Sequence, residues 1–281
     1  MLKREEIRIR DPFILVDKKE KVYYMYGTTE LGNWMEAGCK FSAYKSRDLE
    51  NFEGPFVIFN AEEQDFWADK DFWAPEVHFY KGKYYLFGSF YADGKNRGVH
   101  ILVCDTPLGT FRPLTKEPIS PKGWECLDGT LWIENGKPYM VFSHEWLQIV
   151  DGAICAMELS EDLTRAVSEP VLLFNASDNH LVDTFYHEGL GDQCRVTDGP
   201  FLFKEDGKLK MIWSSHINGR YSVIEAESDS LLGKWKHGGK KFEFDGGHAM
   251  IFEDLNGEKR ISLHKPNTPK GERATFIKLK L

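Results

Sequence analysis

The stretch LDGTLWIENGKPYMVFS, residues 127–143, decides the fold class of this chain. Within it, Asn135-Gly136 separates two short runs in which apolar and polar side chains alternate. Asn-Gly favours the two-residue type I′ turn, because both central residues of that turn need a positive φ. The stretch therefore predicts a β-hairpin with an aspartate, Asp128, at its entrance.

The same pattern occurs four more times along the chain. Each copy consists of an apolar run, a charged or glycine-containing turn and a second apolar run, and the copies start at residues 11, 73, 128, 198 and 247. A third strand-like run follows each copy, at residues 40–45, 98–104, 152–159, 221–227 and 274–279. Copies that begin about every 50–70 residues are typical of β-propeller blades. We therefore expect an all-β fold, a five-bladed β-propeller, in which residues 1–281 form a single domain.

The first ten residues are charged and alternating, with Ile7 and Ile9 on one face. We expect them to form a strand that pairs with the last blade, next to residues 274–281. Such a closure would bring the two termini together and cover the open edges of the first and last sheets.

The composition excludes several classes of partner. Acidic residues outnumber basic ones by 44 to 36, so a net charge of −8 offers no attraction to a nucleic-acid backbone. No apolar run is long enough to cross a membrane, and the first residues, MLKREEIRIRDPF, lack the apolar core of a signal peptide. The five cysteines are scattered without a C-x-x-C pair, which argues against a disulfide framework. We expect a cytoplasmic protein that binds neither nucleic acid nor membrane.

Aspartates stand at the entrance of three of the five repeated hairpins. They are Asp11, Asp128 and Asp198, whereas the other two copies have Ala74 and a position at or next to His248. A propeller places the first strand of every blade at the central axis, so these positions converge. Crowded carboxylates repel one another, which raises the pKa of some of them and separates acid from base roles. Asp-Gly and Asp-Pro are also ordinary turn dipeptides, but three in register favour a functional cluster.

Short motifs follow one another along the chain with the spacing of the blades. They are RDP at 10–12 with YYMYGT at 23–28, WAPEV at 73–77, LDGT at 127–130, DGP at 198–200 and GH at 247–248. Taken together and in this order, they resemble glycoside hydrolase family 43 over essentially the whole chain. The resemblance implies a five-bladed propeller that hydrolyses arabinosyl or xylosyl linkages with inversion. We expect an oligosaccharide as the substrate, attack at terminal units, and α-L-arabinofuranosidase activity ahead of β-xylosidase activity.

The resemblance also implies roles for the three aspartates. It makes Asp11 the general base, and Asp128 the residue that orients the sugar and tunes the pKa of the acid. The family's general acid usually stands in a Glu-Gly-Pro motif, but this chain has Asp198 in that place. Aspartate is one methylene shorter, so its carboxyl would lie about 1.5 Å farther from the leaving oxygen, an error that is large for catalysis. Either the backbone compensates, or Glu188 or Glu145 donates the proton instead.

Other candidate substrate contacts rest on single residues. Trp34 and Trp73 are candidates for stacking on a sugar ring. Glu76 belongs to the second motif, and Arg273 is similar to a late-chain arginine that contacts substrate in part of the family. His248 resembles an axial histidine that lies beside a calcium ion in some members. A structural calcium near His248 is therefore an expectation, although calcium prefers oxygen ligands, and we expect catalysis to require no cofactor.

Two other classes of function stay open on the sequence. One is a sugar-binding propeller that has lost efficient catalysis through the aspartate at position 198. The other is a related five-bladed hydrolase or phosphorylase with a different sugar. A retaining hydrolase would need its two carboxyls about 5–5.5 Å apart rather than about 6.5–9.5 Å. A phosphorylase would need a cluster of cationic residues at the site, for which the sequence shows no obvious candidate. The sequence does not indicate an oligomeric state.

Overall fold

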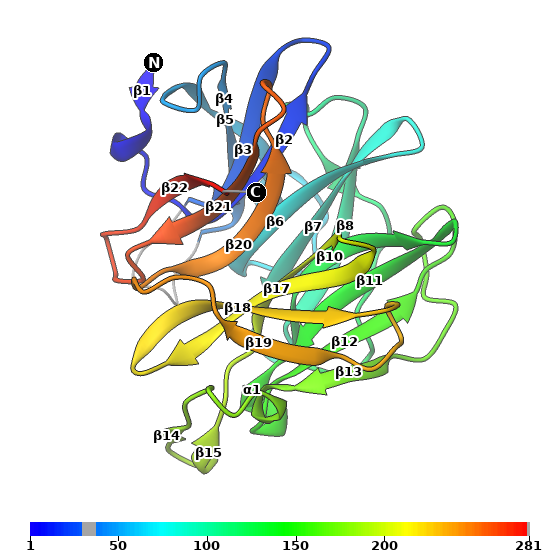
Figure 1. Ribbon diagram of the computed structural model, residues 1–281. Helices are drawn as coiled ribbons and strands as arrows, with labels where there is room; N and C mark the ends of the chain where they lie inside the picture. The colour runs from blue at the N-terminus through cyan, green and yellow to red at the C-terminus, as the bar shows by residue number, and fades with distance from the viewer. Residues whose placement is uncertain (30–37, 280–281) are drawn as a thin grey trace.

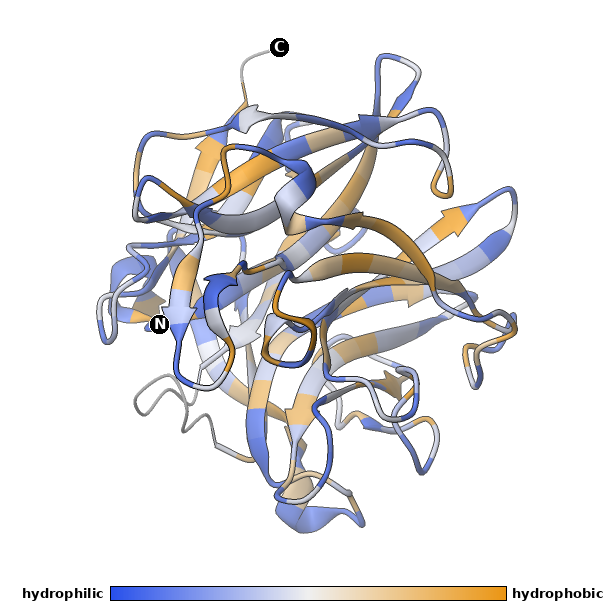
Figure 2. Cartoon of the chain, turned by 90° about the horizontal axis from the view of Figure 1, so that it is seen from below, coloured by the Kyte–Doolittle hydropathy of each residue, from blue (hydrophilic) through white to orange (hydrophobic). Residues whose placement is uncertain are grey.

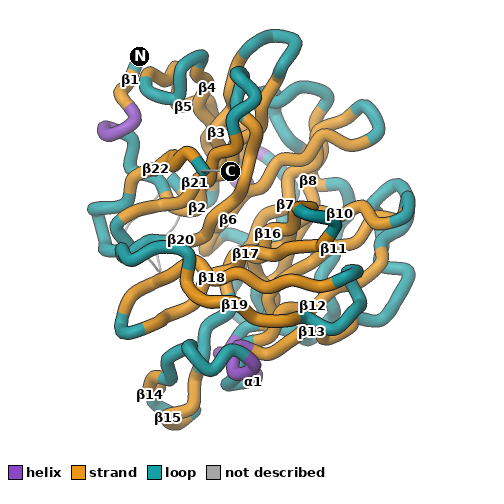
Figure 3. Tube along the Cα trace, viewed as in Figure 1, coloured by secondary structure: helices purple, strands orange, loops and turns teal. Residues whose placement is uncertain are grey.

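The computed structural model describes residues 1–29 and 38–279. Its strands form five antiparallel sheets and one separate two-stranded hairpin, as Figure 1 shows. The five sheets are the blades of a β-propeller, so the all-β, single-domain fold expected from the sequence is confirmed. Figure 3 shows how little of the described chain is helical.

Within each blade the strands follow one another in chain order. Blade 1 consists of β2 (Arg10–Asp17), β3 (Val22–Thr28), β4 (Lys40–Ser46) and β5 (Asn51–Asn60), with β1 (Leu2–Lys3) at its outer edge. Blade 2 consists of β6 (Lys70–Tyr80), β7 (Lys83–Tyr91), β8 (Gly98–Cys104) and β9 (Arg112–Pro113). Blade 3 consists of β10 (Cys126–Glu134), β11 (Lys137–His144), β12 (Ala153–Glu158) and β13 (Val171–Asn175). Blade 4 consists of β16 (Asp198–Glu205), β17 (Lys208–Ile217), β18 (Arg220–Ser228) and β19 (Lys236–Lys240), and blade 5 of β20 (Gly247–Glu253), β21 (Lys259–Lys265) and β22 (Arg273–Lys278).

The first strands of the five blades form a closed ring at the centre of the molecule. Strand β2 contacts β6, β6 contacts β10, β10 contacts β16, β16 contacts β20, and β20 contacts β2 again. The separate hairpin consists of β14 (Phe185–His187) and β15 (Gly191–Cys194). Among the described residues, helical structure is limited to α1 (Trp146–Ile149) and the 3₁₀ turns η1 (Arg4–Glu6), η2 (Ala61–Glu63) and η3 (Ala176–Asp178). Within residues 1–29 and 38–279, no helix has the length and apolar character that crossing a membrane requires.

Apolar side chains fill the spaces between neighbouring blades. Between blades 1 and 2, Phe41, Phe59, Phe72 and Phe90 are all buried, and their ring centroids lie 4.8–6.2 Å apart. Such aromatic pairs stabilise a core beyond the area that they bury. Figure 2 shows hydrophobic bands along the strands and hydrophilic residues in the loops. The blades are therefore packed firmly against one another and hold the ring of first strands in place.

The N-terminal segment departs from the expected strand. Its turn η1 divides it, so that β1 pairs with β5 of blade 1 and not with the last blade. Blade 5 contacts this segment at η1, where Arg273 donates to the Glu5 carbonyl, and pairs with the residues that follow through a bridge between Arg8 and Arg273 and a 3.3 Å hydrogen bond from the Ile9 N–H to the Glu272 carbonyl. Ile7 and Ile9 are both buried, as their alternation indicates. A strand spanning all ten residues was wrong, because the η1 turn redirects the chain.

Every blade carries a β-bulge at the same place on its first strand. The register between first and second strand shifts there, and one residue adopts a φ between 47° and 55°. These five residues are Asp11, Ala74, Asp128, Gly199 and His248. Asp198 therefore lies one position before the bulge, so its expected equivalence with the other two aspartates was wrong. A Cβ at position 199 would come within 2.7 Å of His248 Cδ2, so the bulge of blade 4 has room only for glycine.

Candidate active site

Hydrogen bonds at the bulges tie neighbouring blades together around the axis. In four blades the bulge N–H donates to a side chain at the end of the second strand of the preceding blade. The pairs are Ala74 to Thr28 Oγ1 (2.8 Å), Asp128 to Ser89 Oγ (2.8 Å), His248 to Ser214 Oγ (2.8 Å) and Asp11 to His264 Nδ1 (3.3 Å). A bulge re-aims the side chain that it carries. The repeat thus places the side chains of Asp11, Asp128 and His248 in the wall of one cavity.

Blade 4 breaks this pattern. The Gly199 N–H donates to Asp128 Oδ2 at 3.0 Å. The Ser143 hydroxyl, which stands at the corresponding second-strand position, is buried and has no hydrogen-bond partner in the part of the chain that the structure describes. The carboxylate of Asp128 therefore holds the backbone directly beside Asp198. Through this hydrogen bond, Asp128 of blade 3 helps to fix the position of Asp198 in blade 4.

Asp11 is buried and surrounded by groups that favour its ionised form. Its Oδ2 accepts a 2.7 Å hydrogen bond from the Thr28 hydroxyl, and its Oδ1 lies 3.2 Å from His248 Nδ1. Burial alone would raise the pKa of Asp11, but the charges of His248 and Arg10 are among the effects that outweigh burial and hold the pKa well below its ordinary value. In turn, Asp11 and Asp128 raise the pKa of His248 above its ordinary value despite its burial. Asp11 is therefore a carboxylate at any working pH.

The pKa values of Asp128 and Asp198 shift in the opposite direction. Burial, reinforced by the negative charge of Asp11, raises the pKa of Asp128 to about 6. Burial and the charge of Asp128 raise the pKa of Asp198 to about 7, although a 3.0 Å hydrogen bond from the Tyr221 hydroxyl opposes the shift. Tyr221 is itself buried, which raises its pKa well above the ordinary value, so it remains a donor. One axial site thus holds an ionised aspartate and a second aspartate that keeps its proton near neutral pH.

Glu145 is a third carboxyl with a raised pKa beside the axis. It follows β11, occupies the N-cap position of α1 and is buried. Burial raises its pKa to about 7, although Arg97, whose Nε lies 3.4 Å from Glu145 Oε2, opposes the shift. The Arg97 guanidinium lies 4.0 Å from the centroid of the Trp73 ring and 3.1 Å from an oxygen of Asp71. A cation–π contact and two acids therefore hold Arg97 in the cavity wall.

The cavity has a volume of about 380 Å³ and receives residues from all five blades. Six of the residues singled out from the sequence line it: Asp11, Trp73, Asp128, Glu145, Asp198 and His248. Residues that the sequence did not indicate include Arg10, Arg97, Trp146, His187, His216, Tyr221 and Asn267. Arg97 and Tyr221 stand just before and at the start of a third-strand run, where no local pattern indicates that a side chain reaches the axis.

The other sequence candidates lie elsewhere or outside the described residues. Trp34 falls within residues 30–37, which the structure does not describe. Glu76 is buried beside His78, 3.1 Å from its Nε2, and Glu188 is exposed in the turn of the β14–β15 hairpin. Arg273 donates from Nε to the Glu5 carbonyl at 2.7 Å and so anchors the N-terminal segment. None of these three lines the cavity, so the structure does not bring them to the substrate position that the sequence proposed.

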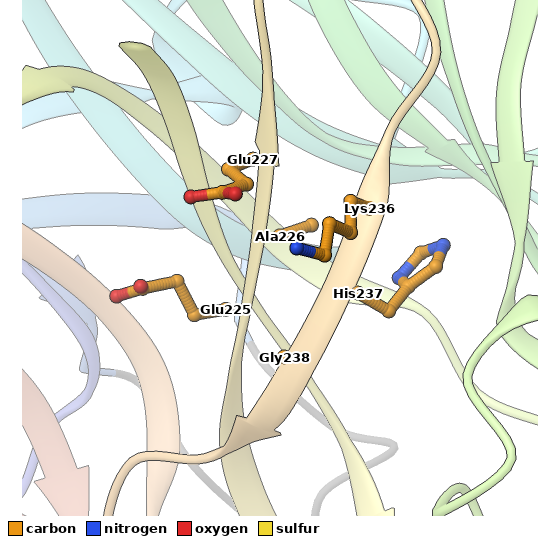
Figure 4. A pocket seen from close by; sticks show the side chains of 6 residues that line it. All are labelled: Glu225, Ala226, Glu227, Lys236, His237 and Gly238. Atoms are coloured by element: carbon orange, nitrogen blue, oxygen red, sulfur yellow. The ribbon is translucent and has the colours of Figure 1, made fainter. Parts of the chain in front are cut away.

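A second hollow, of about 220 Å³, lies between β18 and β19 and is shown in Figure 4. Its lining comes from these two neighbouring strands alone and includes Glu225, Glu227, Lys236 and His237. The Glu225 carboxylate pairs with Lys210 and Lys241. This hollow receives no group from another blade and lies away from the ring of first strands, so the axial cavity is the candidate active site.

The described residues contain no ready set of protein ligands for a metal ion. They contain no group of three or more His, Cys, Asp or Glu side chains placed to hold an ion. Nδ1 of His248 faces the carboxylates of Asp11 and Asp128, at 3.2 and 3.7 Å. Calcium beside His248 stays a prediction.

The comparisons with known proteins agree with this geometry. The family model of glycosyl hydrolases family 43 matches residues 6–279. The chain belongs to this family. No curated protein matches the chain. Membership of family 43 makes the protein an inverting glycosidase.

Several solved structures resemble this family 43 protein over nearly all of its length. An endo-arabinase from Bacteroides thetaiotaomicron VPI-5482 is 40% identical, with 100% of this chain and 97% of that chain covered and a TM-score of 0.92. A thermostable family-43 glycoside hydrolase is 25% identical, with coverages of 97% and 90% and a TM-score of 0.80. An α-L-arabinofuranosidase from Lactobacillus brevis is 14% identical, with coverages of 99% and 94% and a TM-score of 0.73. At this last identity the likeness concerns the fold alone.

Proposed function

We propose that this family 43 enzyme hydrolyses α-L-arabinosyl linkages of pentose oligosaccharides and releases terminal units. The arabinosyl preference, but not the action at chain ends, is supported by the 40% identity, over the whole chain, with a protein named as an endo-arabinase. Action at chain ends is supported by the cavity, because about 380 Å³ lies near the lower limit of small-molecule sites and suits a short segment of sugar. The observation that carries the catalytic assignment is the opposite shift in pKa of Asp11 and Asp198.

In the proposed reaction, Asp11 is the general base. Its pKa lies well below the ordinary value, so the carboxylate is ready to accept a proton from water at neutral pH. That water attacks the anomeric carbon on the face opposite to the leaving group, which inverts the configuration. The contact with His248 and the hydrogen bond from Thr28 fix the orientation of the carboxylate.

Asp198 is the proposed general acid. A pKa of about 7 leaves a large share of the carboxyl protonated in neutral solution, where it can transfer its proton to the leaving oxygen. Asp128 assists in two ways: its negative charge raises the pKa of Asp198, and its Oδ2 holds the Gly199 N–H next to the acid. The hydrogen bond from the Tyr221 hydroxyl supports this assignment, because it fixes the orientation of a carboxyl that is one methylene shorter than glutamate. Glu145, whose pKa is also about 7, is the alternative proton donor.

The substrate assignment is tested by a panel of pentose oligosaccharides. We expect turnover of arabinobiose and longer arabino-oligosaccharides, with single arabinose as the first product, and kcat/KM at least about tenfold lower on xylo-oligosaccharides. Chromatography of the products at low conversion measures both the preference and the mode of cleavage. Mixed oligosaccharides as first products would contradict release from chain ends. Faster cleavage of xylobiose would contradict the arabinosyl preference.

Tyr221→Phe tests how the acid is positioned. The Tyr221 hydroxyl donates to Asp198 and favours its ionised form, so removing it should raise the pKa of Asp198. Because the acid must be protonated, the alkaline limb of the pH profile should move to higher pH. Loss of one hydrogen bond to the acid should lower kcat on arabinobiose about threefold to tenfold.

The pH dependence of kcat/KM on arabinobiose is the measurement for this variant. Tyr139→Phe is a matched control, because its hydroxyl bonds to Glu158 at 3.3 Å on an outer strand, away from the cavity. A lower kcat with an unmoved alkaline limb would show that Tyr221 supports only the fold.

A further inference from the structure

The connection between blades 3 and 4 builds a wall beside the axial cavity. It contains the hairpin of β14 and β15, which Figures 1 and 3 show next to α1 at one end of the molecule. The ring of Trp146 in α1 lies edge-on to Phe185, with centroids 4.8 Å apart, and to His187, with centroids 5.3 Å apart. We call Trp146, Leu147, Phe185 and His187 the hairpin wall.

The hairpin wall continues the lining of the cavity. Trp146, Leu147 and His187 line it together with Asp198. Leu147 remains 40% exposed, and the imidazole of His187 stands in the cavity wall beside it. Aromatic and apolar surface next to an imidazole fits a sugar, which offers an apolar ring face and hydroxyl groups.

The hairpin wall lies on the side of the proposed acid. Strand β15 ends at Cys194, four residues before Asp198, and α1 begins directly after Glu145. Backbone hydrogen bonds from Arg195 to Val150 (3.0 Å) and from Gly152 to Arg195 (2.9 Å) join the chain after α1 to the chain before the acid. In an inverting hydrolase the acid contacts the leaving oxygen, while the base and its water lie on the opposite face of the sugar. Groups that flank the acid therefore face the leaving group.

We infer that the hairpin wall binds the sugar units on the leaving-group side of the cleaved bond, with Trp146 against a pentose ring and His187 bonded to a hydroxyl. This inference rests on the proposed function, and it makes chain length a determinant of the rate. Each further sugar unit that reaches the hairpin wall adds contact area between the substrate and the protein. The enzyme consequently favours chains of several units over a disaccharide, even though it releases one unit at a time.

The hairpin also provides its own control. Side chains alternate between the two faces of a strand, so Phe185 and His187 share the face that contacts Trp146, and Tyr186 lies on the other face. Tyr186 is 71% exposed and does not line the cavity. Removal of the Tyr186 ring changes the same strand without touching the face that we assign to the sugar.

The test compares kcat/KM on arabinobiose and on arabinopentaose for the wild type and for Trp146→Ala, His187→Ala and Tyr186→Ala. We expect the ratio of the pentasaccharide value to the disaccharide value to fall about tenfold in Trp146→Ala, which corresponds to about 1.4 kcal/mol. In His187→Ala we expect a fall of about threefold, as for one hydrogen bond. In Tyr186→Ala the ratio should stay within about twofold of the wild type, since surface changes have small effects. The ratio within one variant does not depend on how much of that protein is folded.

The outcomes separate this inference from the proposed function. A ratio that stays at the wild-type value in both Trp146→Ala and His187→Ala would show that the hairpin wall does not bind the leaving-group sugars. The proposed arabinosyl activity would be unaffected by that result. An equal fall in Tyr186→Ala would also overturn the sugar-binding role of the hairpin wall, because the effect would then come from the hairpin as a whole. In a third outcome, the wild type cleaves neither arabinobiose nor arabinopentaose and binds neither sugar by calorimetry. That result would overturn both the proposed function and the sugar-binding role of the hairpin wall.

Discussion

Asp11→Asn should lower kcat by a factor of about 10³–10⁴ on every arabinosyl substrate, because the variant has no base to deprotonate the attacking water. Asparagine has nearly the same shape and can still accept the hydrogen bond from Thr28. The loss should be equally large for a 4-nitrophenyl arabinoside and for arabinobiose, since a better leaving group does not replace the base. Burst-free steady-state rates on both substrates provide the measurement.

Azide provides a second test of Asp11 as the general base. Azide is a nucleophile without any deprotonation, so it should restore part of the turnover of Asp11→Asn and form an arabinosyl azide of inverted configuration. Asp17→Asn, at the other end of strand β2, is the matched control and should retain the wild-type rate. Turnover of Asp11→Asn within tenfold of the wild type, or the absence of any azide product, would assign the base to another group.

Asp198→Asn should produce a loss that depends on the leaving group. On arabinobiose, whose leaving alkoxide needs a proton, we expect kcat to fall about 10²–10⁴-fold. On a 4-nitrophenyl arabinoside the fall should be about tenfold or less, because nitrophenolate leaves with little protonation. The comparison of the two substrates separates proton donation from a general disturbance of the site.

The pH profile provides a second check on the acid. The proton of Asp198 is present below a pKa of about 7 and is lost above it, so wild-type kcat/KM on arabinobiose should fall as the pH rises through about 7. Asp128, with a pKa of about 6, is close enough that the two carboxyls titrate as a pair. In Asp198→Asn this alkaline limb should disappear. If arabinobiose turnover and the limb survive in Asp198→Asn but are lost in Glu145→Gln, the proton donor is Glu145.

The sequence by itself determined the blades and two of the three axial aspartates. Turns such as Asn135-Gly136 and the alternation of the strands act over a few residues, so the five hairpins follow from local preference. Asp11 and Asp128 occupy the same position in two copies of one repeat, and equal positions in a propeller meet at the axis. Their convergence could therefore be predicted without coordinates.

Only the tertiary structure decided the rest of the site. Asp198 lies one residue out of register, because the packing of His248 against Gly199 leaves no room for a side chain at the bulge. Tyr221 and Arg97 reach the cavity from outside the first strands, and β1 pairs with blade 1 because η1 turns the chain. These features depend on contacts between residues far apart in the chain, which leave no periodic signal in the sequence. The pKa values of Asp11 and Asp198 likewise depend on which charges the closed ring brings near them, so the roles of base and acid emerge only in the folded protein.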